Sequence, residues 1–140
     1  MGRILAIDYG RKRVGIALTD EMQMFASPHS TVATKDIFIV LKKFILEDNV
    51  EKIIVGKPTQ MNGADSESML YIKPFIKQLS REFPAIPVEM IDERFTSKMA
   101  SAVIAQSGLN KKDRQDKSLI DKVSAAIILQ SYLETKSFLR

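Results

Sequence analysis

The sequence predicts an α/β domain with a mixed sheet, antiparallel on one side and parallel on the other. Two observations support this fold class. The first 32 residues contain an unbroken aliphatic run, a short turn, an alternating segment and a third strand-like segment. From residue 37 onward, apolar residues recur at helical spacing, and short strand-like segments stand between the helices. The expected order is three strands, a helix, a strand, a helix, a strand and two further helices.

The first three strands are expected at residues 3–8, 14–19 and 25–32. The first is an unbroken aliphatic run, and the second alternates large and small side chains. A turn at residues 10–12 is short enough to make these two strands an antiparallel hairpin. Pro28 cannot donate to a sheet ladder, so the third strand is expected at an edge.

The parallel half begins with a helix whose apolar positions run from residue 37 to residue 45, with Thr34 as its expected N-cap. Residues 52–55 form a short strand of the kind buried between helices. A helix around residues 69–79 and a strand at residues 88–91 follow. Residues 99–105 suggest another helix, ended by Gly108, and the last helix is expected at residues 119–133.

Composition narrows the class of protein. At 140 residues the chain is expected to be a single domain over residues 1–140. The net charge of +4 permits a polyanionic partner without requiring one. The absence of cysteine excludes disulfides and thiolate metal sites. No signal peptide or membrane-spanning run is visible, which predicts a soluble, cytoplasmic protein without a membrane partner.

Acidic residues stand where a ligand site is expected. Asp8 ends the first strand, Asp92 and Glu93 end the last strand, and Asp121 begins the last helix. Ligands of open α/β sheets bind at the carboxyl ends of the strands. Asp121 shares a helix face with apolar residues at Ala125, Ile128, Leu129 and Tyr132, so we expect it to face the sheet.

Converging carboxylates repel one another unless cations neutralise them. Mg²⁺ or Mn²⁺ suits oxygen ligands, and two such ions can cleave a phosphodiester. Structural explanations stand beside this one. Asp8 can cap the hairpin turn, Asp92 or Glu93 can be a solvated strand end, and Asp121 has the capping-box spacing from Ser118.

Two groups of cations accompany the acids. Arg11, Lys12 and Arg13 follow Asp8 directly and can draw phosphates toward it. A second group precedes the last helix and is either a substrate clamp or a solvated loop: Lys111, Lys112, Arg114 and Lys117. Tyr9 can stack on a base, although packing against the hairpin is an equal alternative.

Four segments together resemble the YqgF/RuvX family of Holliday junction resolvase-like or pre-16S rRNA nucleases. They are AIDYGRKRVGIALTD, IIVGKPTQMNG, DERFTS and IDKVSAAIILQSYL, and they cover almost the whole chain. The resemblance implies an RNase H-like, three-layer fold with a mixed five-stranded sheet, three strands antiparallel and then two parallel.

The resemblance also implies a metal-binding cluster of Asp8, Glu93 and Asp121, with Asp92 as the fallback for Glu93 because side chains alternate along a strand. Arg94 would contact phosphate or orient the acids. The chain departs from the family's usual Gly-Leu-Pro at Lys57, which can add a phosphate contact or project into solvent.

The activity implied by the resemblance is cleavage of structured nucleic acid, with 5′ processing of pre-16S rRNA on pre-ribosomal particles as the first interpretation. A resolvase of branched, four-way DNA is the second, and it would act as a two-fold dimer; a monomer or a weak homodimer is expected. A non-catalytic binding factor is a third. A fourth is an ATPase of the actin and sugar kinase class, although those proteins pair two such domains around a cleft.

Overall fold

The computed structural model of the chain describes residues 2–57, 67, 69–92 and 117–138. The described strands form one five-stranded sheet in the order β3-β2-β1-β4-β5. The elements are β1 (Arg3–Tyr9), β2 (Arg13–Thr19), β3 (Ala26–Ala33), a 3-10 turn η1 (Thr34–Asp36), α1 (Ile37–Glu47), β4 (Val50–Lys57), α2 (Met69–Glu82), β5 (Val88–Asp92) and α5 (Lys117–Phe138).

The hairpin of β1 and β2 is confirmed, with the three-residue connection at residues 10–12. The backbone N–H of Gly10 donates to the carbonyl of Arg13 at 3.0 Å and closes the turn. In the antiparallel register Asp8 lies opposite Gly15. The last acid of β1 therefore has a neighbour without a side chain on β2.

β3 is confirmed as an edge strand that contains Pro28. Its pairing with β2 is irregular, because Ile16 faces Ser30 whereas Ala17 faces Pro28. His29 is the extra residue of this bulge. Its ring lies edge-on to Phe44 of α1 at 4.8 Å between centroids, which is a packing contact.

The expected N-cap role of Thr34 is wrong. The 3-10 turn η1 intervenes before α1 begins at Ile37, and Asp36 stands at the N-cap position without a side-chain cap bond. The Thr34 hydroxyl instead donates to the carbonyl of Gly10 at 2.7 Å, and its N–H donates to the carbonyl of Lys12 at 3.0 Å. The hydroxyl and the N–H of Thr34 both find carbonyl acceptors in the hairpin turn, whereas α1 begins three residues later at Ile37.

The parallel half of the sheet is also confirmed, with β4 parallel to both β1 and β5. β4 extends beyond the expected residues 52–55 at both ends, because Val50 at the start and Gly56 at the end are also buried in the sheet. α2 continues through Pro74, whose side chain is exposed.

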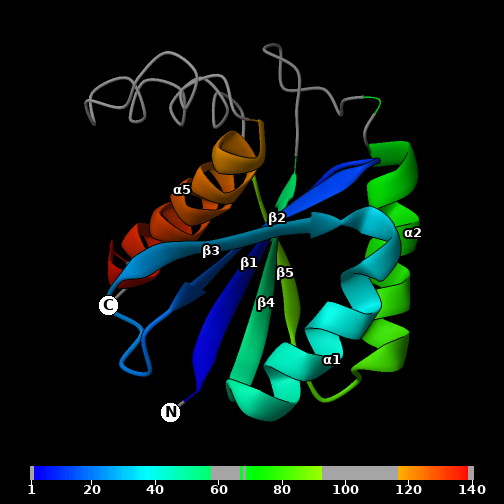
Figure 1. Cartoon of the computed structure of the whole chain (residues 1–140). Helices are drawn as coiled ribbons and strands as arrows, with labels where there is room; N and C mark the ends of the chain where they lie inside the picture. Colours follow the sequence, from blue (N-terminus) through cyan, green and yellow to red (C-terminus); the bar gives the residue numbers. More distant parts are fainter. Residues whose placement is uncertain (1, 58–66, 68, 93–116, 139–140) are drawn as a thin grey trace.

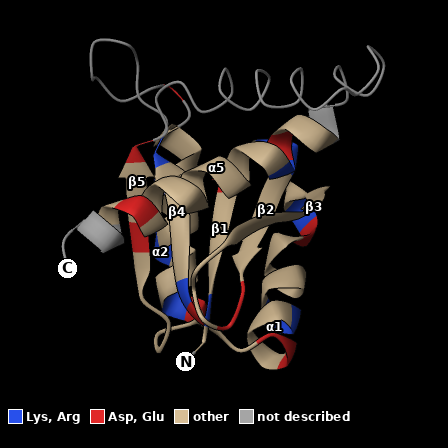
Figure 2. Cartoon of the chain, turned by 90° about the vertical axis from the view of Figure 1, so that its left-hand side faces the viewer, with Lys and Arg blue, Asp and Glu red and all other residues tan. Residues whose placement is uncertain are grey.

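Alternation along the strands divides the core into two layers, one on each side of the sheet (Figure 1). Leu5 and Ile7 point to the side covered by α1 and α2. Ile4 and Ala6 point to the side covered by α5, which crosses in front of the sheet in Figure 2. The result is the three-layer arrangement that the sequence predicted.

α5 differs from the expected helix at residues 119–133. It begins at Lys117, two residues earlier, and ends at Phe138. Asp121 therefore lies past the first turn, and Ser118 is inside the helix and cannot be the N-cap of a capping box. The apolar stripe marks only the part of a helix that touches the core, and none of the flanking polar residues breaks a helix. Among the described helices, none combines the length and apolar composition needed to cross a bilayer.

Candidate nucleic-acid site at the carboxyl end of the sheet

Asp8 lies at the carboxyl end of β1 on the side of α5. It follows Ile4 and Ala6 by alternation, and both of those side chains are buried in the core layer under α5. Asp8 is partly buried, so its carboxylate is reachable but shielded on the sheet side. The buried aliphatic run of β1 therefore places the Asp8 carboxylate at the edge of the sheet where the strand ends.

Asp121 reaches the same place from α5. A Cβ added at Gly15 would overlap the carbonyl group of Asp121, so the helix backbone rests directly on β2 at this point. Because Gly15 is the cross-strand neighbour of Asp8, the contact brings the second turn of α5 beside Asp8. The expected sheet-facing position of Asp121 is consistent with its stripe, since Ala125, Ile128 and Leu129 are all buried.

The hairpin cations surround this contact. The Arg13 Nε donates to Oδ2 of Asp121 at 2.7 Å, and the two side chains keep 43% and 23% of their surface exposed. A hollow of about 560 Å³ has these described residues in its lining: Gly10, Arg11, Lys12, Arg13 and Asp121. Arg11 and Lys12 are exposed. The site therefore carries a positive rim, one member of which already neutralises an acid.

Asp92 lies on the other side of the sheet. Val88 packs in the core layer of α1 and α2, and Ile91 packs in the layer of α5, so alternation turns Asp92 toward α2. Lys57 is the register partner of Asp92 and shares its side. Both residues are at the same rim as Asp8, but they do not face α5.

The remaining candidates lie outside the described residues: Glu93, Arg94, Lys111, Lys112, Arg114 and the helix expected at residues 99–105. Within residues 2–57, 67, 69–92 and 117–138, no group of three or more acidic or histidine side chains could hold a metal ion. The structure joins Arg13 to Asp121 by a hydrogen bond and places Asp8 opposite Gly15, the residue that the backbone of Asp121 touches.

The chemistry of these donors fits a hard divalent cation. Carboxylate oxygens on a rigid strand and a rigid helix are the ligands that Mg²⁺ and Mn²⁺ prefer. Asp8 and Asp121 come from elements that are in backbone contact through Gly15, so neither needs a loop to hold it. Arg13 supplies the compensating positive charge at Asp121, which the sequence argument had assigned to metal alone.

Sequence reasoning missed two supports of this site. The first is Thr34, which holds the hairpin turn. The second is Gly15, whose missing side chain admits α5; a glycine inside an alternating strand is a recognised sign of close backbone approach. Tyr9 packs against α2 and not against the hairpin as the structural alternative expected, with its ring stacked on Phe75 at 4.0 Å between centroids.

Solved structures place the fold in a class. The chain is similar to RuvC of T. thermophilus in complex with Holliday junction substrate, with a TM-score of 0.59 at 14% identity, over 99% of this chain and 97% of that one. It is also similar to the yeast mitochondrial Holliday junction resolvase Ydc2, with a TM-score of 0.51 at 13% identity, over 97% of this chain and 79% of that one. The fold is therefore the RNase H-like fold of these resolvases.

Sequence comparison identifies the family. The model described as "RuvX: Holliday junction resolvase" matches residues 2–135. A protein of Phocaeicola vulgatus described as "Putative pre-16S rRNA nuclease" is 52% identical, over 99% of this chain and 100% of its own length. A protein of Porphyromonas gingivalis with the same description is 49% identical, over 96% of this chain and 97% of its own length. The chain belongs to the RuvX family.

Proposed function

We propose that this chain is a metal-dependent endonuclease that hydrolyses phosphodiester bonds in structured RNA. The observation that carries the proposal is the backbone contact of Asp121 with Gly15, the cross-strand neighbour of Asp8, beside a hollow lined by the hairpin cations. Carboxylates at the end of a strand and on the helix that covers it, beside groups that attract phosphate, are suited to hydrolysis of a polyanion.

Asp8, Glu93 and Asp121 would hold Mg²⁺ or Mn²⁺, as two ions. Bound ions would activate a water and stabilise the leaving oxygen. Alternation supports Glu93 over Asp92, because Asp92 points toward α2. Arg13 would keep Asp121 oriented through its 2.7 Å hydrogen bond and limit the repulsion between the acids.

The cations have distinct proposed roles. Arg11 and Lys12 are exposed at the hollow beside Asp121 and would contact substrate phosphates. Lys57 lies on the α2 side of the rim and would contact a more distant part of the substrate. Four further residues are proposed as phosphate contacts from sequence alone: Arg94, Lys111, Lys112 and Arg114.

The proposed substrate is the 5′ end of pre-16S rRNA within pre-ribosomal particles, and the proposed setting is the cytoplasm. The support is the description shared by the relatives of Phocaeicola vulgatus and Porphyromonas gingivalis, which match over nearly their whole lengths. We also propose that residues 1–140 form one nuclease domain that works as a monomer or a weak homodimer.

Cleavage of four-way DNA junctions is the second candidate. The description of the matching family model favours it. Paired cuts in a junction require two active sites related by a two-fold axis, so this candidate requires a dimer on its substrate.

The test is a cleavage assay with two labelled substrates in Mg²⁺ or Mn²⁺. One is an RNA that spans the 5′ boundary of 16S rRNA, and the other is an immobile four-way DNA junction. Asp8→Asn keeps the shape of the side chain and removes its charge. Asp36→Asn is the matched control, because Asp36 is exposed at the start of α1 and makes no capping bond.

We expect Asp8→Asn to lose about a thousandfold in rate, since bound metal ions supply several kcal/mol of transition-state stabilisation. Asp36→Asn should cleave at the wild-type rate. The substrate that is cut decides between the two candidates. Binding of both substrates without cleavage, equal in the wild type and Asp8→Asn, would leave a non-catalytic binding factor and reject the nuclease.

A further inference from the structure

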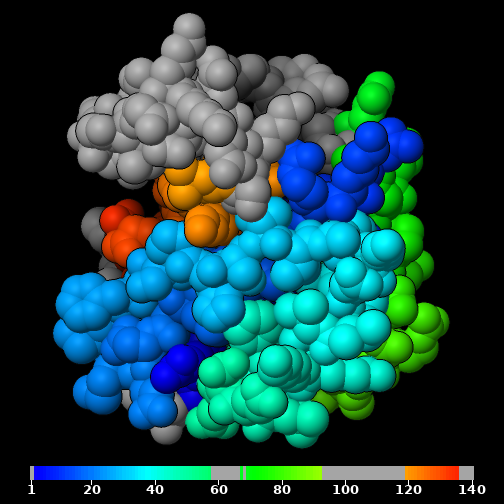
Figure 3. Space-filling view, viewed as in Figure 1, coloured from blue at the N-terminus to red at the C-terminus, as the bar shows by residue number. Residues whose placement is uncertain are grey.

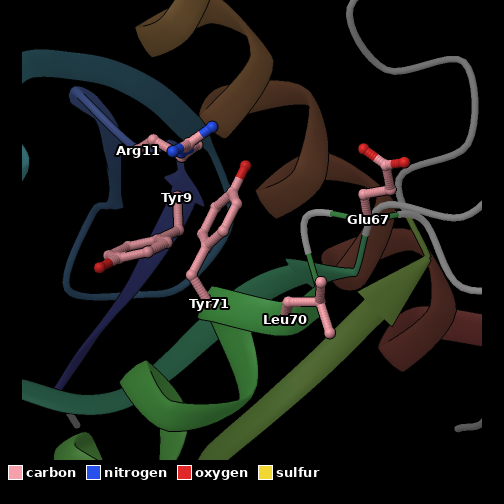
Figure 4. Close-up of a pocket in the computed structure, with 5 residues that line it drawn as sticks. All are labelled: Tyr9, Arg11, Glu67, Leu70 and Tyr71. Carbon is pink, nitrogen blue, oxygen red and sulfur yellow. The ribbon is translucent and has the colours of Figure 1, made fainter.

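A second hollow lies on the other side of the hairpin, at the start of α2. It measures about 550 Å³ and is lined by Tyr9, Arg11, Glu67, Leu70 and Tyr71 (Figure 4). Leu70 keeps 80% of its surface exposed, which leaves an uncovered apolar surface beside the ring of Tyr71. Nothing in the proposed hydrolysis uses these residues except Arg11.

The aromatic wall of this hollow is braced from behind. Tyr9 stacks on Phe75 of α2, with 17° between the ring planes. The rings of Tyr71 and Tyr9 lie 6.1 Å apart at 44°. Burial, and then the neighbouring Tyr71, raises the pKa of the Tyr9 hydroxyl, so Tyr9 stays neutral at physiological pH. A ring supported in this way loses little freedom when a flat ligand stacks on it.

The polar groups of the hollow differ in charge. The Arg11 guanidinium carbon lies 5.9 Å from the centre of the Tyr71 ring, a cation–π arrangement that holds the cation at one end. Glu67 stands across the opening from Tyr71, with Leu70 between them (Figure 4). These three groups match the parts of a nucleotide. The aromatic face can stack on the base, the cation can pair with a phosphate, and the carboxylate can accept hydrogen bonds from N–H groups of the base.

The position of the hollow matches a single substrate strand. Arg11 lines both this hollow and the one beside Asp121, so the turn at residues 10–12 separates them. The space-filling view shows the dark blue hairpin atoms directly beside the green atoms of α2 (Figure 3). A strand whose phosphates lie on the hairpin can place one base in this hollow and present its backbone to Asp8 and Asp121.

We infer that this hollow binds one unpaired nucleobase of the substrate and prefers guanine. The inference rests on the proposed function, because it assumes a nucleic-acid strand across the hairpin. The base stacks on Tyr71 and covers Leu70, and the Glu67 carboxylate accepts from its Watson–Crick edge. Guanine is the one standard base with two adjacent donors on that edge, N1–H and the 2-amino group. Each of the other bases has one donor group there, and the atom beside it is an acceptor that a carboxylate repels.

The test is binding of fluorescein-labelled RNA decamers by anisotropy in EDTA, which prevents metal-dependent cleavage. The decamers are oligo(A) with a single central guanosine, inosine or adenosine. We expect guanosine to bind more tightly than inosine, which lacks the 2-amino group. Tyr71→Ala should weaken guanosine binding about tenfold, whereas Tyr71→Phe retains the stacking face and should keep the affinity. Phe25→Ala is the matched control, because Phe25 is an exposed aromatic residue in the loop before β3.

Glu67→Gln gives an independent reading that does not depend on removing a ring. Glu67 is exposed. We expect the variant to bind the guanosine and inosine decamers with equal affinity, while it still binds RNA. Equal affinities for all three decamers, or a Tyr71→Ala loss no larger than that of Phe25→Ala, would overturn the base site. If cleavage then still requires Asp8, the proposed function stands without this inference; if no RNA is bound or cut, both fail.

Discussion

The two sides of the sheet are built differently although they share the same strands. Toward α5 the central strands present Ala6, Ala17 and Gly15 beside the larger Ile4 and Ile54, and the backbone of α5 touches β2 at Gly15. Toward α1 and α2 the same strands present large aliphatic side chains such as Leu5, Ile7 and Ile16, which pack against aromatic residues. On the α5 side the helix backbone lies close to β2 at Gly15, and on the other side more large apolar side chains are buried.

This difference separates positioning from stability. Close backbone contact at Gly15 brings Asp121 to the strand next to Asp8, in a layer with fewer large buried side chains than the layer under α1 and α2. The thick layer under α1 and α2 contributes most of the large buried side chains and stands away from the acids. Variants on the α5 side should therefore affect activity more than stability, and variants in the other layer should do the opposite.

Gly15→Ala should have the largest combined effect. The new methyl group would overlap the Asp121 carbonyl, so α5 must move away from β2. Overpacking of this kind costs about 1–3 kcal/mol of unfolding free energy, and displacement of a catalytic group by about 1 Å can cost about a hundredfold in rate. Urea unfolding and cleavage assays would measure the two losses; an unchanged rate would show that the Gly15 contact does not position Asp121.

Leu79→Ala is the counterpart in the other layer. Leu79 is fully buried in α2, and its truncation should lower the free energy of unfolding by about 2–5 kcal/mol. The rate of cleavage per folded molecule should stay at the wild-type value at a temperature where the variant is folded. A loss of rate as large as that of Gly15→Ala would remove the distinction between the two sides.

Arg13→Gln and Arg11→Gln should separate two kinds of cation at the hairpin. Arg13 is hydrogen-bonded to Asp121, whereas Arg11 lies over Tyr71 and lines both hollows. A cation that contacts a phosphate contributes about one unit to the salt dependence of binding. We expect Arg11→Gln to lower the slope of log affinity against log salt by about one, and Arg13→Gln to lower it less while reducing the cleavage rate. Equal slopes for the two variants would contradict this division.

Asp20→Asn should have the smallest effect and concerns neither side of the sheet. Hydrogen bonds from the backbone N–H of Phe25, and also of Met24 and Met22, lower the pKa of the Asp20 carboxyl. Because the folded-state pKa is the lower one, the carboxylate stabilises the fold above pH about 4 and loses this contribution as pH falls through the folded-state pKa. Melting temperatures should differ slightly at pH 7 and converge in acid; a constant difference would contradict the assignment.

Much of the fold follows from local patterns. The unbroken run before Asp8, the alternation after Arg13 and the helical spacing from Ile37 each correspond to one element, and Pro28 correctly placed β3 at an edge. The prediction that Asp121 lies on the sheet-facing stripe of its helix also followed from the sequence, because a buried stripe fixes the rotation of a helix.

Tertiary partners were not predictable in the same way. Thr34 has the residue type of an N-cap, but its hydroxyl bonds to Gly10, which lies 24 residues earlier in the turn. The Arg13–Asp121 pair spans 108 residues of sequence, and no periodicity links them. The limits of α5 were missed because the polar residues at both ends do not extend the apolar pattern, although none of them breaks a helix.

The Thr34 contacts have a consequence for how quickly and selectively the hairpin can meet a polyanion. Two hydrogen bonds from the segment after β3 hold the turn that carries Arg11 and Lys12. The loop conformation is therefore set when the protein folds, and binding does not have to order the backbone of the turn. A pre-arranged charge pattern of this kind favours strands whose phosphate spacing matches it over flexible polyanions of the same net charge.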